Sequence, residues 1–377
     1  MLFFVEMKRK TIYIKGDFKM KKIRVGIIGT GFGAKVHAPV MQSHQGFEIV
    51  SIASVSRGRL VEIKEETGIE KVYGNWEEML ESEEIDLVSV ASAPLLHHDM
   101  VVKAFSSGKH VLCEKPMAFD ADEAEKMIQA RDAAGKMGWI NFEYRFLPAR
   151  QKIKEIISSG KIGKVLHVNF SLNIAGYERY ATSKRGWLSQ KDQAGGMLGA
   201  VGSHLIDSLL WWTDAKVEFV SGQLTTHVPE FTDENGEKEV RTADDAFQAM
   251  GNFLGGGTFN IGSNIAVRHA EGWELEVYGT EGTIKMSQDN IVLVGIGNDP
   301  LEEVELEEAL SIPDGMNPVA AGYFNAFYRS LDEVYKALSG EGVNPHLPVL
   351  EDGHGVQVVM DAIRRSHEEK RMVIVEY

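Results

Sequence analysis

The chain of 377 residues has a single cysteine and no long apolar run. Cys113 alone excludes an internal disulfide or a cluster of thiolate ligands, and it fits a reducing compartment. Because no apolar stretch reaches about 18 residues, we expect no helix that spans a bilayer. These absences together predict a cytoplasmic protein without a membrane partner.

Basic residues are also few, since 40 Lys and Arg stand against 55 Asp and Glu and give a net charge of −15. This balance repels a phosphate backbone and no basic stripe offsets it, so we expect no nucleic-acid partner. Hydrophobic residues make up 44% and charged residues 25%, which are ordinary globular values and exclude wholesale disorder. The length indicates two domains.

Residues 1–19 are interpreted as an N-terminal extension. Their apolar start ends at Glu6 and is too short for the core of a secretory signal. Met20 directly precedes the first strand pattern, so Met1 and Met20 both remain possible starts of the native chain. Sequencing the N-terminus of the native protein distinguishes them.

Residues 20–141 alternate short apolar runs with amphipathic helical stretches. The apolar runs are 23–29, 47–53, 86–91, 110–114 and 137–141. Near-continuous apolar strands that alternate with helices are typical of a parallel sheet covered on both faces. The sequence therefore predicts an α/β dinucleotide-binding domain with a doubly wound, Rossmann-type sheet.

After Pro148 the pattern changes to alternating strands, with helical patterns between some of them. The strand patterns are 165–174, 217–228, 246–254, 257–267 and 274–286, and the helical ones are 198–212, 320–338 and 355–369. This predicts that residues 142–377 form an α+β domain with a large, mainly antiparallel open sheet. We expect this domain to hold the substrate and the contacts between subunits.

A glycine-rich segment directly follows the first strand pattern: Gly29-Thr30-Gly31-Phe32-Gly33-Ala34. It has the G-x-G-x-x-A form of the dinucleotide fingerprint. Gly29 permits the tight turn, Gly31 lets the backbone approach a pyrophosphate, and Ala34 allows close helix–strand packing. The start of the following helix offers N–H groups to the phosphates.

The end of the second strand pattern indicates which dinucleotide binds, and residues 52–59 contain no Asp or Glu. A carboxylate there binds the ribose hydroxyl of NAD, whereas an Arg accommodates the 2′-phosphate of NADP. Ser54 and Arg57 suit a phosphate, so the sequence favours NADP over NAD. The alternative is that Arg57 and Arg59 only begin the next helix in solvent.

Three further stretches resemble those of one family. Residues 108–116 are similar to the G-K-H-V-x-x-E-K-P motif of the Gfo/Idh/MocA oxidoreductases, and residues 93–98 resemble their T-P-x-x-x-H loop, with Ala93 for the usual Thr. Residues 141–148 resemble the crossing into the family's second domain. The resemblance extends from Lys22 to the C-terminus and implies a nicotinamide cofactor. The cofactor contacts that it implies include Ala93, Pro94, His98, Glu114, Lys115 and Arg145.

Lys115 is the predicted catalytic residue of the first domain. It follows the fifth strand pattern, and ligands of such sheets bind outside the carboxyl ends of the strands. An ammonium there can hydrogen-bond a substrate hydroxyl, and partial burial readily lowers its pKa. Pro116 is expected to stiffen the bond after the lysine, with the cis form as a candidate geometry. Glu114 is expected to orient Lys115 or the cofactor rather than to react.

The second catalytic residue is expected in residues 195–207, which resemble the family's D-x-x-x-H helix. His204 is present, but Ala200 stands four residues before it, so the carboxylate is missing. Residues at i and i+4 share a helix face, which lets such a pair exchange a proton. Three interpretations stay open: His204 acts alone or with Lys115, another carboxylate substitutes, or the chain binds ligands without efficient turnover.

The substrate is expected between the domains, above the nicotinamide. Tyr144, Tyr177 and Trp187 are candidates to line that site together with His204, although aromatic residues at such positions are as often core. Arg145 either binds a carboxylate or pairs with an acid between the domains. No histidine spacing indicates a metal site.

The residues and the resemblance together predict an NAD(P)-dependent oxidoreductase that interconverts a secondary alcohol and a ketone on a sugar, polyol or related small molecule. Two alternatives remain: a non-catalytic dinucleotide-sensing regulator on the same fold, and a reductase of an imine or an unsaturated compound. Because families of this kind often pair the open faces of their sheets, we expect a homodimer or homotetramer.

Overall fold

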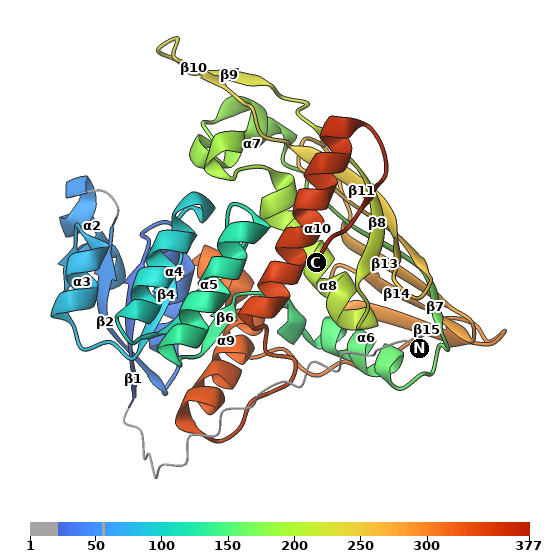
Figure 1. Ribbon diagram of the computed structural model, residues 1–377, viewed down its shortest axis with the longest axis horizontal. Coiled ribbons are helices and arrows are strands. Elements are labelled where there is room, and N and C mark those ends of the chain that lie inside the picture. The colour runs from blue at the N-terminus through green and yellow to red at the C-terminus, as the bar shows by residue number, and fades with distance from the viewer. Residues whose placement is uncertain (1–21, 55–56) are drawn as a thin grey trace.

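The computed structural model describes residues 22–54 and 57–377, and these form two large sheets that differ in size and strand direction, besides a two-stranded hairpin (Figure 1). The predicted extension at residues 1–19, and with it the choice between Met1 and Met20, lies outside the described residues. Within the described ranges, no helix is long and apolar enough to cross a membrane, and no group of three or more potential ligands is arranged to hold a metal ion.

The N-terminal sheet has six parallel strands in the order β3-β2-β1-β4-β5-β6. The strands are β1 (Ile23–Ile28), β2 (Phe47–Ala53), β3 (Val72–Tyr73), β4 (Leu87–Val90), β5 (His110–Cys113) and β6 (Gly138–Ile140). This order is that of a doubly wound dinucleotide-binding fold, which confirms the predicted class. Each predicted apolar run contains one strand. The pattern missed β3, because two residues are too few to show a period.

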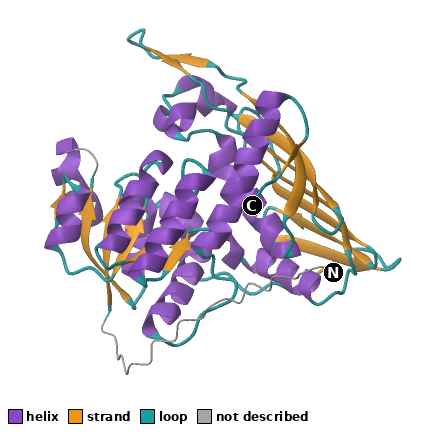
Figure 2. Ribbon diagram, viewed as in Figure 1, coloured by secondary structure: helices purple, strands orange, loops and turns teal. Residues whose placement is uncertain are grey.

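Helices cover both faces of this sheet (Figure 2). They are α1 (Ala38–Ser43), α2 (Leu60–Thr67), α3 (Trp76–Ser82), α4 (His97–Ser106) and α5 (Ala121–Ala134). All four residues of β4 are buried, as expected for a central strand that is covered on both sides. The carboxyl ends of these strands therefore form one edge, along which the loops that bind ligands are grouped.

The second sheet has nine strands in the order β16-β15-β14-β13-β7-β12-β11-β8-β17, and every pair is antiparallel except β7 with β12. Its strands are β7 (Val165–Asn173), β8 (Val217–Thr225), β11 (Ala246–Phe253), β12 (Thr258–Asn264), β13 (Gly272–Gly279), β14 (Gly282–Ser287), β15 (Ile291–Ile296), β16 (Glu302–Glu303) and β17 (Val373–Ile374). The predicted mainly antiparallel open sheet is confirmed. Strands β15 to β17 were not predicted.

One face of the large sheet packs against helices (Figure 2), and the side chains that line a hollow on its other face are largely polar. On β7, Val168 and Phe170 are buried on the helix side, whereas Asn169 and Ser171 alternate onto the open side. The covering helices are α6 (Pro148–Ser158), α8 (Ser203–Thr213) and α10 (Leu350–Glu369). The helix predicted over 198–212 begins as a π-helical turn, η7 (Leu198–Gly202), and continues as α8.

Helix α9 (Pro318–Ser339) belongs to the predicted second domain but packs into the core of the first. Its buried Phe324 and Phe327 join one cluster with Ile23 and Val25 of β1. The apolar stripe of α9 predicts a helix, but a stripe does not say which sheet it covers. This packing also places Tyr323 near the glycine-rich turn.

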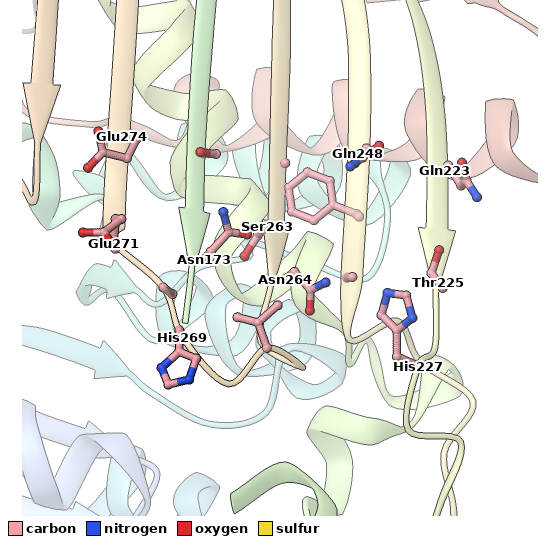
Figure 3. Close-up of a pocket in the computed structure, with 17 residues that line it drawn as sticks. Asn173, Gln223, Thr225, His227, Gln248, Ser263, Asn264, His269, Glu271 and Glu274 are labelled. Atoms are coloured by element: carbon pink, nitrogen blue, oxygen red, sulfur yellow. The ribbon is translucent and has the colours of Figure 1, made fainter. Parts of the chain in front are cut away.

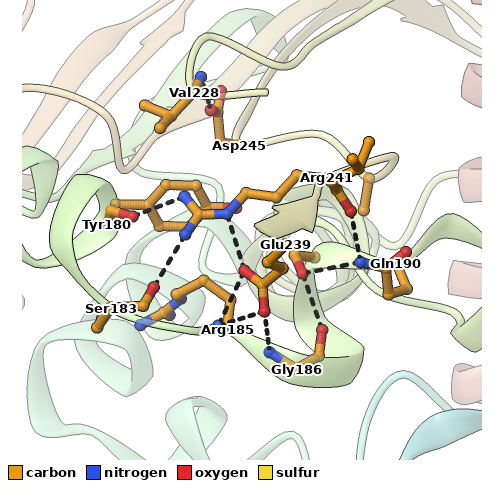
Figure 4. A network of polar contacts seen from close by, with 12 residues as sticks. Tyr180, Ser183, Arg185, Gly186, Gln190, Val228, Glu239, Arg241 and Asp245 are labelled. Atoms are coloured by element: carbon orange, nitrogen blue, oxygen red, sulfur yellow. Dashed lines mark hydrogen bonds and ion pairs between the residues drawn. The ribbon is translucent and has the colours of Figure 1, made fainter. Parts of the chain in front are cut away.

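A small hairpin extends from the second domain and is fastened to a neighbouring segment by Arg241 (Figure 4). The hairpin consists of β9 (Glu230–Thr232) and β10 (Lys238–Val240), and the segment contains α7 (Tyr177–Thr182). The buried guanidinium of Arg241 donates to the carbonyl oxygens of Tyr180 at 2.6 Å and Ser183 at 2.9 Å. These contacts hold in place the segment that carries Tyr177 and Trp187, two of the predicted substrate residues.

Candidate active site

The glycine-rich turn after β1 has the shape that a dinucleotide requires. Gly29 has a φ of 119°, and a Cβ atom there would lie 2.2 Å from the carbonyl oxygen of Ala91. A Cβ atom on Gly31 would meet nothing within 4 Å, so open space lies over this residue. Gly33 packs closely, since its Cβ would be 3.0 Å from Cγ2 of Ile27, and Ala34 is buried. These residues therefore fit a pyrophosphate at Gly31.

The end of β2 holds Ser54, whose hydroxyl lies 3.4 Å from that of Thr30 in the glycine-rich turn. Ser54 is buried and its amide donates to the carbonyl of Tyr73. The side chain of Arg57 is not among those that the structure describes, so the preference for NADP stays a prediction.

The Ala93-Pro94 loop leads into α4, whose first two residues, His97 and His98, have different surroundings. His97 is fully buried, with its ring nitrogens 3.0 Å from the carbonyl oxygen of Pro116 and 3.1 Å from that of Ser92. His98 instead places Nδ1 2.8 Å from Asp99 on the surface side of the helix. The resemblance implies His98 as a cofactor contact, and this role stays a prediction. The helix start turns His97 inward, where it supports the Lys115–Pro116 segment.

Glu114 is buried at the centre of a polar network. Its Oε1 accepts a hydrogen bond from Asn141 at 2.6 Å and lies 2.9 Å from Nε2 of His37, whose Nδ1 is 2.6 Å from the hydroxyl of Ser89. Burial favours a raised pKa, but hydrogen bonding to His37 and the charge of Lys115 hold the pKa of Glu114 below its ordinary value. The carboxylate also accepts from the amide of Lys115, so it orients the start of that segment.

Lys115 reaches across the domains to the π-helical turn η7. The Lys115–Pro116 bond is cis, and the ammonium donates to the carbonyl oxygen of Ala200 at 3.0 Å. Turns of this kind are frequent at functional sites, since the wider turn leaves carbonyl groups less completely paired. Ala200 is one turn before His204, so the ammonium of Lys115 contacts the turn that leads to this histidine.

His204 is buried between two aromatic rings at the start of α8. Its imidazole lies 4.4 Å from the ring of Tyr144 and 5.9 Å, edge-on, from that of Phe142. Nδ1 is buried and has no hydrogen-bond partner among the described residues. Burial, followed by the charges of Lys115 and Arg150, holds the pKa of His204 well below its ordinary value. The imidazole is therefore neutral at pH 7 and able to accept a hydrogen bond.

Glu143 is a site residue that the sequence analysis missed. It is 1% exposed, and its Oε2 atom lacks a hydrogen-bond partner within the described part of the chain. Burial and the neighbouring charge of Glu114 raise the pKa of Glu143 to about 8, against the opposing effect of Lys115. The only available signal was a carboxylate inside the apolar segment that precedes Pro148.

Tyr144 is a centre of aromatic contacts beside the site. Its ring is parallel to that of Tyr323 at 6.3 Å, and the guanidinium of Arg150 lies 4.9 Å from its centroid. Tyr323 in turn meets Phe32 of the glycine-rich turn edge-on at 5.0 Å. These contacts join the predicted cofactor turn to His204, and Tyr323 could not be placed there from sequence.

Tyr177 and Trp187 lie on the segment that Arg241 fastens. Tyr177 begins α7 and lies under the guanidinium of Arg268 at 4.6 Å. Trp187 is 38% exposed, and the following Leu188 accepts a hydrogen bond from Gly196, which leads into η7. Their described contacts include neither Lys115 nor His204, so their role toward a substrate stays a prediction.

Arg145 forms ion pairs with acidic residues of the second domain. Its buried guanidinium donates to Asp207 of α8 at 2.5 to 3.1 Å and lies 3.3 Å from Asp352 of α10. Although burial opposes the charge, these two carboxylates raise the pKa of Arg145 above its ordinary value. The structure therefore shows the pairing of Arg145 with acids, and a cofactor contact of this residue stays a prediction.

The polar face of the large sheet carries a broad hollow of about 730 Å³ (Figure 3). Amide side chains from neighbouring strands line it, among them Asn173, Gln223, Gln248 and Asn264. Lys115 and His204 are not among its lining residues. The hollow is therefore separate from the site between the domains.

Comparisons with known proteins agree with this architecture. Residues 23–142 match an oxidoreductase family with an NAD-binding Rossmann fold, and residues 150–285 match the Gfo/Idh/MocA C-terminal domain. An uncharacterized oxidoreductase of Synechocystis sp. is 28% identical over 95% of this chain and 97% of its own length. Levoglucosan dehydrogenase of Pseudarthrobacter phenanthrenivorans is 26% identical over 94% of this chain and 99% of its own length.

The same fold is found in a solved structure of levoglucosan dehydrogenase in complex with NADH and levoglucosan. That structure is 24% identical, with a TM-score of 0.84, and the match covers 95% of this chain and 100% of the other. The glycine-rich turn, the segment of Lys115 and the helix that bears His204 all lie within the matched family domains. The chain therefore belongs to the Gfo/Idh/MocA family of oxidoreductases.

Proposed function

We propose that the protein is an NAD(P)-dependent dehydrogenase that interconverts a secondary alcohol and a ketone on a sugar or polyol. The observation that carries this proposal is the meeting of Lys115, from the carboxyl end of β5, with the helix that bears His204. The name and full-length similarity of levoglucosan dehydrogenase support a polyhydroxylated substrate.

In this proposal the first domain holds the dinucleotide and the second domain completes the site. The turn at Gly31, the Ala93-Pro94 loop and Glu114 would hold the cofactor. When bound, the nicotinamide accepts a hydride from the carbinol carbon of the substrate. The ammonium of Lys115 donates a hydrogen bond to the substrate oxygen and stabilises negative charge that develops on it. Nδ1 of His204 accepts a hydrogen bond from the same hydroxyl.

NADPH is expected to bind at least about tenfold more tightly than NADH, because Ser54 and Arg57 suit a 2′-phosphate. Fluorescence titration of both nucleotides at fixed ionic strength measures this difference. The Arg57→Ala variant should lose most of the preference, and Arg59→Ala serves as the matched control. Equal affinities in the unmodified protein would contradict the choice of NADP and leave NAD as the cofactor.

We also propose that two copies pair through the polar face of the large sheet. Directly opposite side chains on β7 and β12 include Asn169 and Asn260, which are hydrogen-bonded at 3.0 Å. Light scattering should give the mass of two or four chains, and Asn260→Arg should lower it because like charges would meet across a symmetric interface. A monomer at micromolar concentration would exclude this arrangement.

A second candidate function is a dinucleotide-sensing regulator, and Ala200 is the observation that favours it. Without a carboxylate at this position, binding need not lead to turnover. Screening polyols, aldoses and keto-sugars for turnover distinguishes the dehydrogenase from the sensor. Screening ketones and imines with the reduced cofactor distinguishes the dehydrogenase from a reductase of imines. Cofactor binding without turnover across this panel would favour the sensor.

A further inference from the structure

The proposed reaction lacks a good final acceptor for the substrate's proton. Oxidation of an alcohol releases one proton, and His204 is the acceptor that the sequence motif suggests. A second proton on its imidazole would add a cation where the charges of Lys115 and Arg150 already act. Because the site is buried, this repulsion is weakly screened. His204 is therefore suited to accept a hydrogen bond but not to keep the proton.

Position 200 does not supply the acceptor either. The ammonium of Lys115 is hydrogen-bonded to the main-chain oxygen of Ala200, and the methyl side chain there cannot accept a proton. A carboxylate at this position would stand beside the ammonium and one turn before His204. Without this group, position 200 of η7 offers no side chain that can accept the proton.

Glu143 brings a carboxylate to the same place from another element. It begins the short helical turn η4 (Glu143–Phe146), and its chain neighbours Phe142 and Tyr144 both contact the imidazole of His204. The side chain is almost fully buried, and Oε2 has no partner in the described structure. Because an unsatisfied buried polar atom costs free energy, such an atom in a native structure needs an explanation, and a catalytic role is one.

We propose that Glu143 is a catalytic residue whose Oε2 atom takes the proton of the substrate hydroxyl, in place of the carboxylate that is absent at position 200. The inference rests on the proposed dehydrogenase function. In the bound alcohol the O–H points to Nδ1 of His204, and during oxidation it turns to Oε2. The O–H bond then breaks and its proton bonds to Oε2, while the hydrogen on the same carbon leaves with its electron pair for the bound nicotinamide. Carbon and oxygen then form the carbonyl double bond. In reduction the neutral carboxyl group returns the proton.

The charges around Glu143 make it a base of suitable strength. Glu114 and Lys115 face it from the segment after β5, Arg150 from α6, Tyr323 from α9, and Tyr144 lies next to it in its own turn. Burial, reinforced by Glu114, raises the pKa of Glu143 to about 8, while Lys115 and Arg150 keep it from rising further. Since the carboxylate is the acceptor, the oxidation rate should rise with pH through about 8, and the reduction rate should fall there.

The variant Glu143→Gln keeps the shape of the side chain but cannot accept a proton. We expect kcat for oxidation to fall by about 10² to 10⁴-fold and the rise with pH to disappear. Dissociation constants for NADPH and NADH should stay within about threefold. Glu155→Gln on α6, which is solvent-exposed, is the matched control and should leave the pH profile unchanged. Weaker cofactor binding at unchanged kcat would make Glu143 a cofactor contact and overturn the proposal.

The double variant Glu143→Gln/Ala200→Asp tests whether the two carboxylates are equivalent. A carboxylate restored beside Lys115 should recover at least about tenfold of the lost kcat. The oxidation rate of the double variant should rise at a lower pH than that of the unmodified protein. The reason is that a carboxylate next to the ammonium has a lower pKa. A double variant no more active than Glu143→Gln alone would contradict the replacement.

Infrared difference spectra between pH 6 and pH 10 test Glu143 without any substrate. A protonated carboxyl band that disappears near pH 8 should be present in the unmodified protein and absent in Glu143→Gln. If this band is found but no polyol is turned over, the proposed function fails while the acceptor chemistry of Glu143 stands. If the carboxyl group is already ionised at pH 6, the inference about Glu143 fails whatever the enzyme does.

Discussion

Lys115→Met is expected to lower kcat by about 10³-fold or more while NADPH and NADH bind within about threefold of their original affinity. The ammonium acts on the substrate oxygen, whose charge changes during the reaction, whereas the glycine-rich turn that fits the pyrophosphate is untouched. Steady-state kinetics on any accepted polyol, combined with fluorescence titration of the nucleotides, measures both quantities.

Two comparisons make the Lys115 result specific. Lys103→Met removes an ammonium from the partly exposed surface of α4 and should leave both kinetics and binding unchanged. Lys115→Arg keeps a positive charge but not its compact shape, so it should recover only a small part of the activity. If Lys115→Met retained most of its kcat, the lysine would be a structural contact to Ala200 and the proposed chemistry would be wrong.

The parts of the site that are contiguous in sequence could be predicted. The turn at Gly29 to Ala34 and the segment ending at Pro116 each carry their own chemistry and follow a strand directly, so local pattern places them at one sheet edge. The six-stranded sheet was predictable for the same reason, because each strand of four or more residues lies in a mostly apolar run. Short edge strands such as β3 carry too few residues for any pattern.

The residues that contact these motifs could not be predicted, because they come from distant parts of the sequence and only tertiary packing brings them to the site. His37 meets Glu114 from the helix after the glycine-rich turn, 77 residues away in sequence. Tyr323 reaches the site only because α9 packs on the first domain. Glu143 shows no spacing to Lys115 or His204 that a motif could record. Buried polar groups of this kind are seen only when their neighbours are known.

Arg145→Met is expected to lower the free energy of unfolding by about 3 to 5 kcal/mol at pH 8. Asp207 is 2% exposed, and without the guanidinium it would be a buried carboxylate near Asp352 with nothing to neutralise it. Urea denaturation followed by far-ultraviolet circular dichroism measures the difference. The helix interface between α8 and η4 should be the part that loosens first.

The pH dependence of this loss separates an unpaired charge from a simple packing defect. Burial already raises the pKa of Asp207 to about 6 in the presence of Arg145, and removing the guanidinium raises it further. A carboxyl group whose pKa is higher folded than unfolded keeps its proton at low pH, so stability falls as the pH rises through that range. The deficit of Arg145→Met should therefore be smaller at pH 5 than at pH 8. Lys191→Met, which breaks an exposed pair with Glu368, should cost below about 1 kcal/mol at both values. A deficit of Arg145→Met that did not change with pH would show that lost packing, and not the charge left on Asp207, causes the instability.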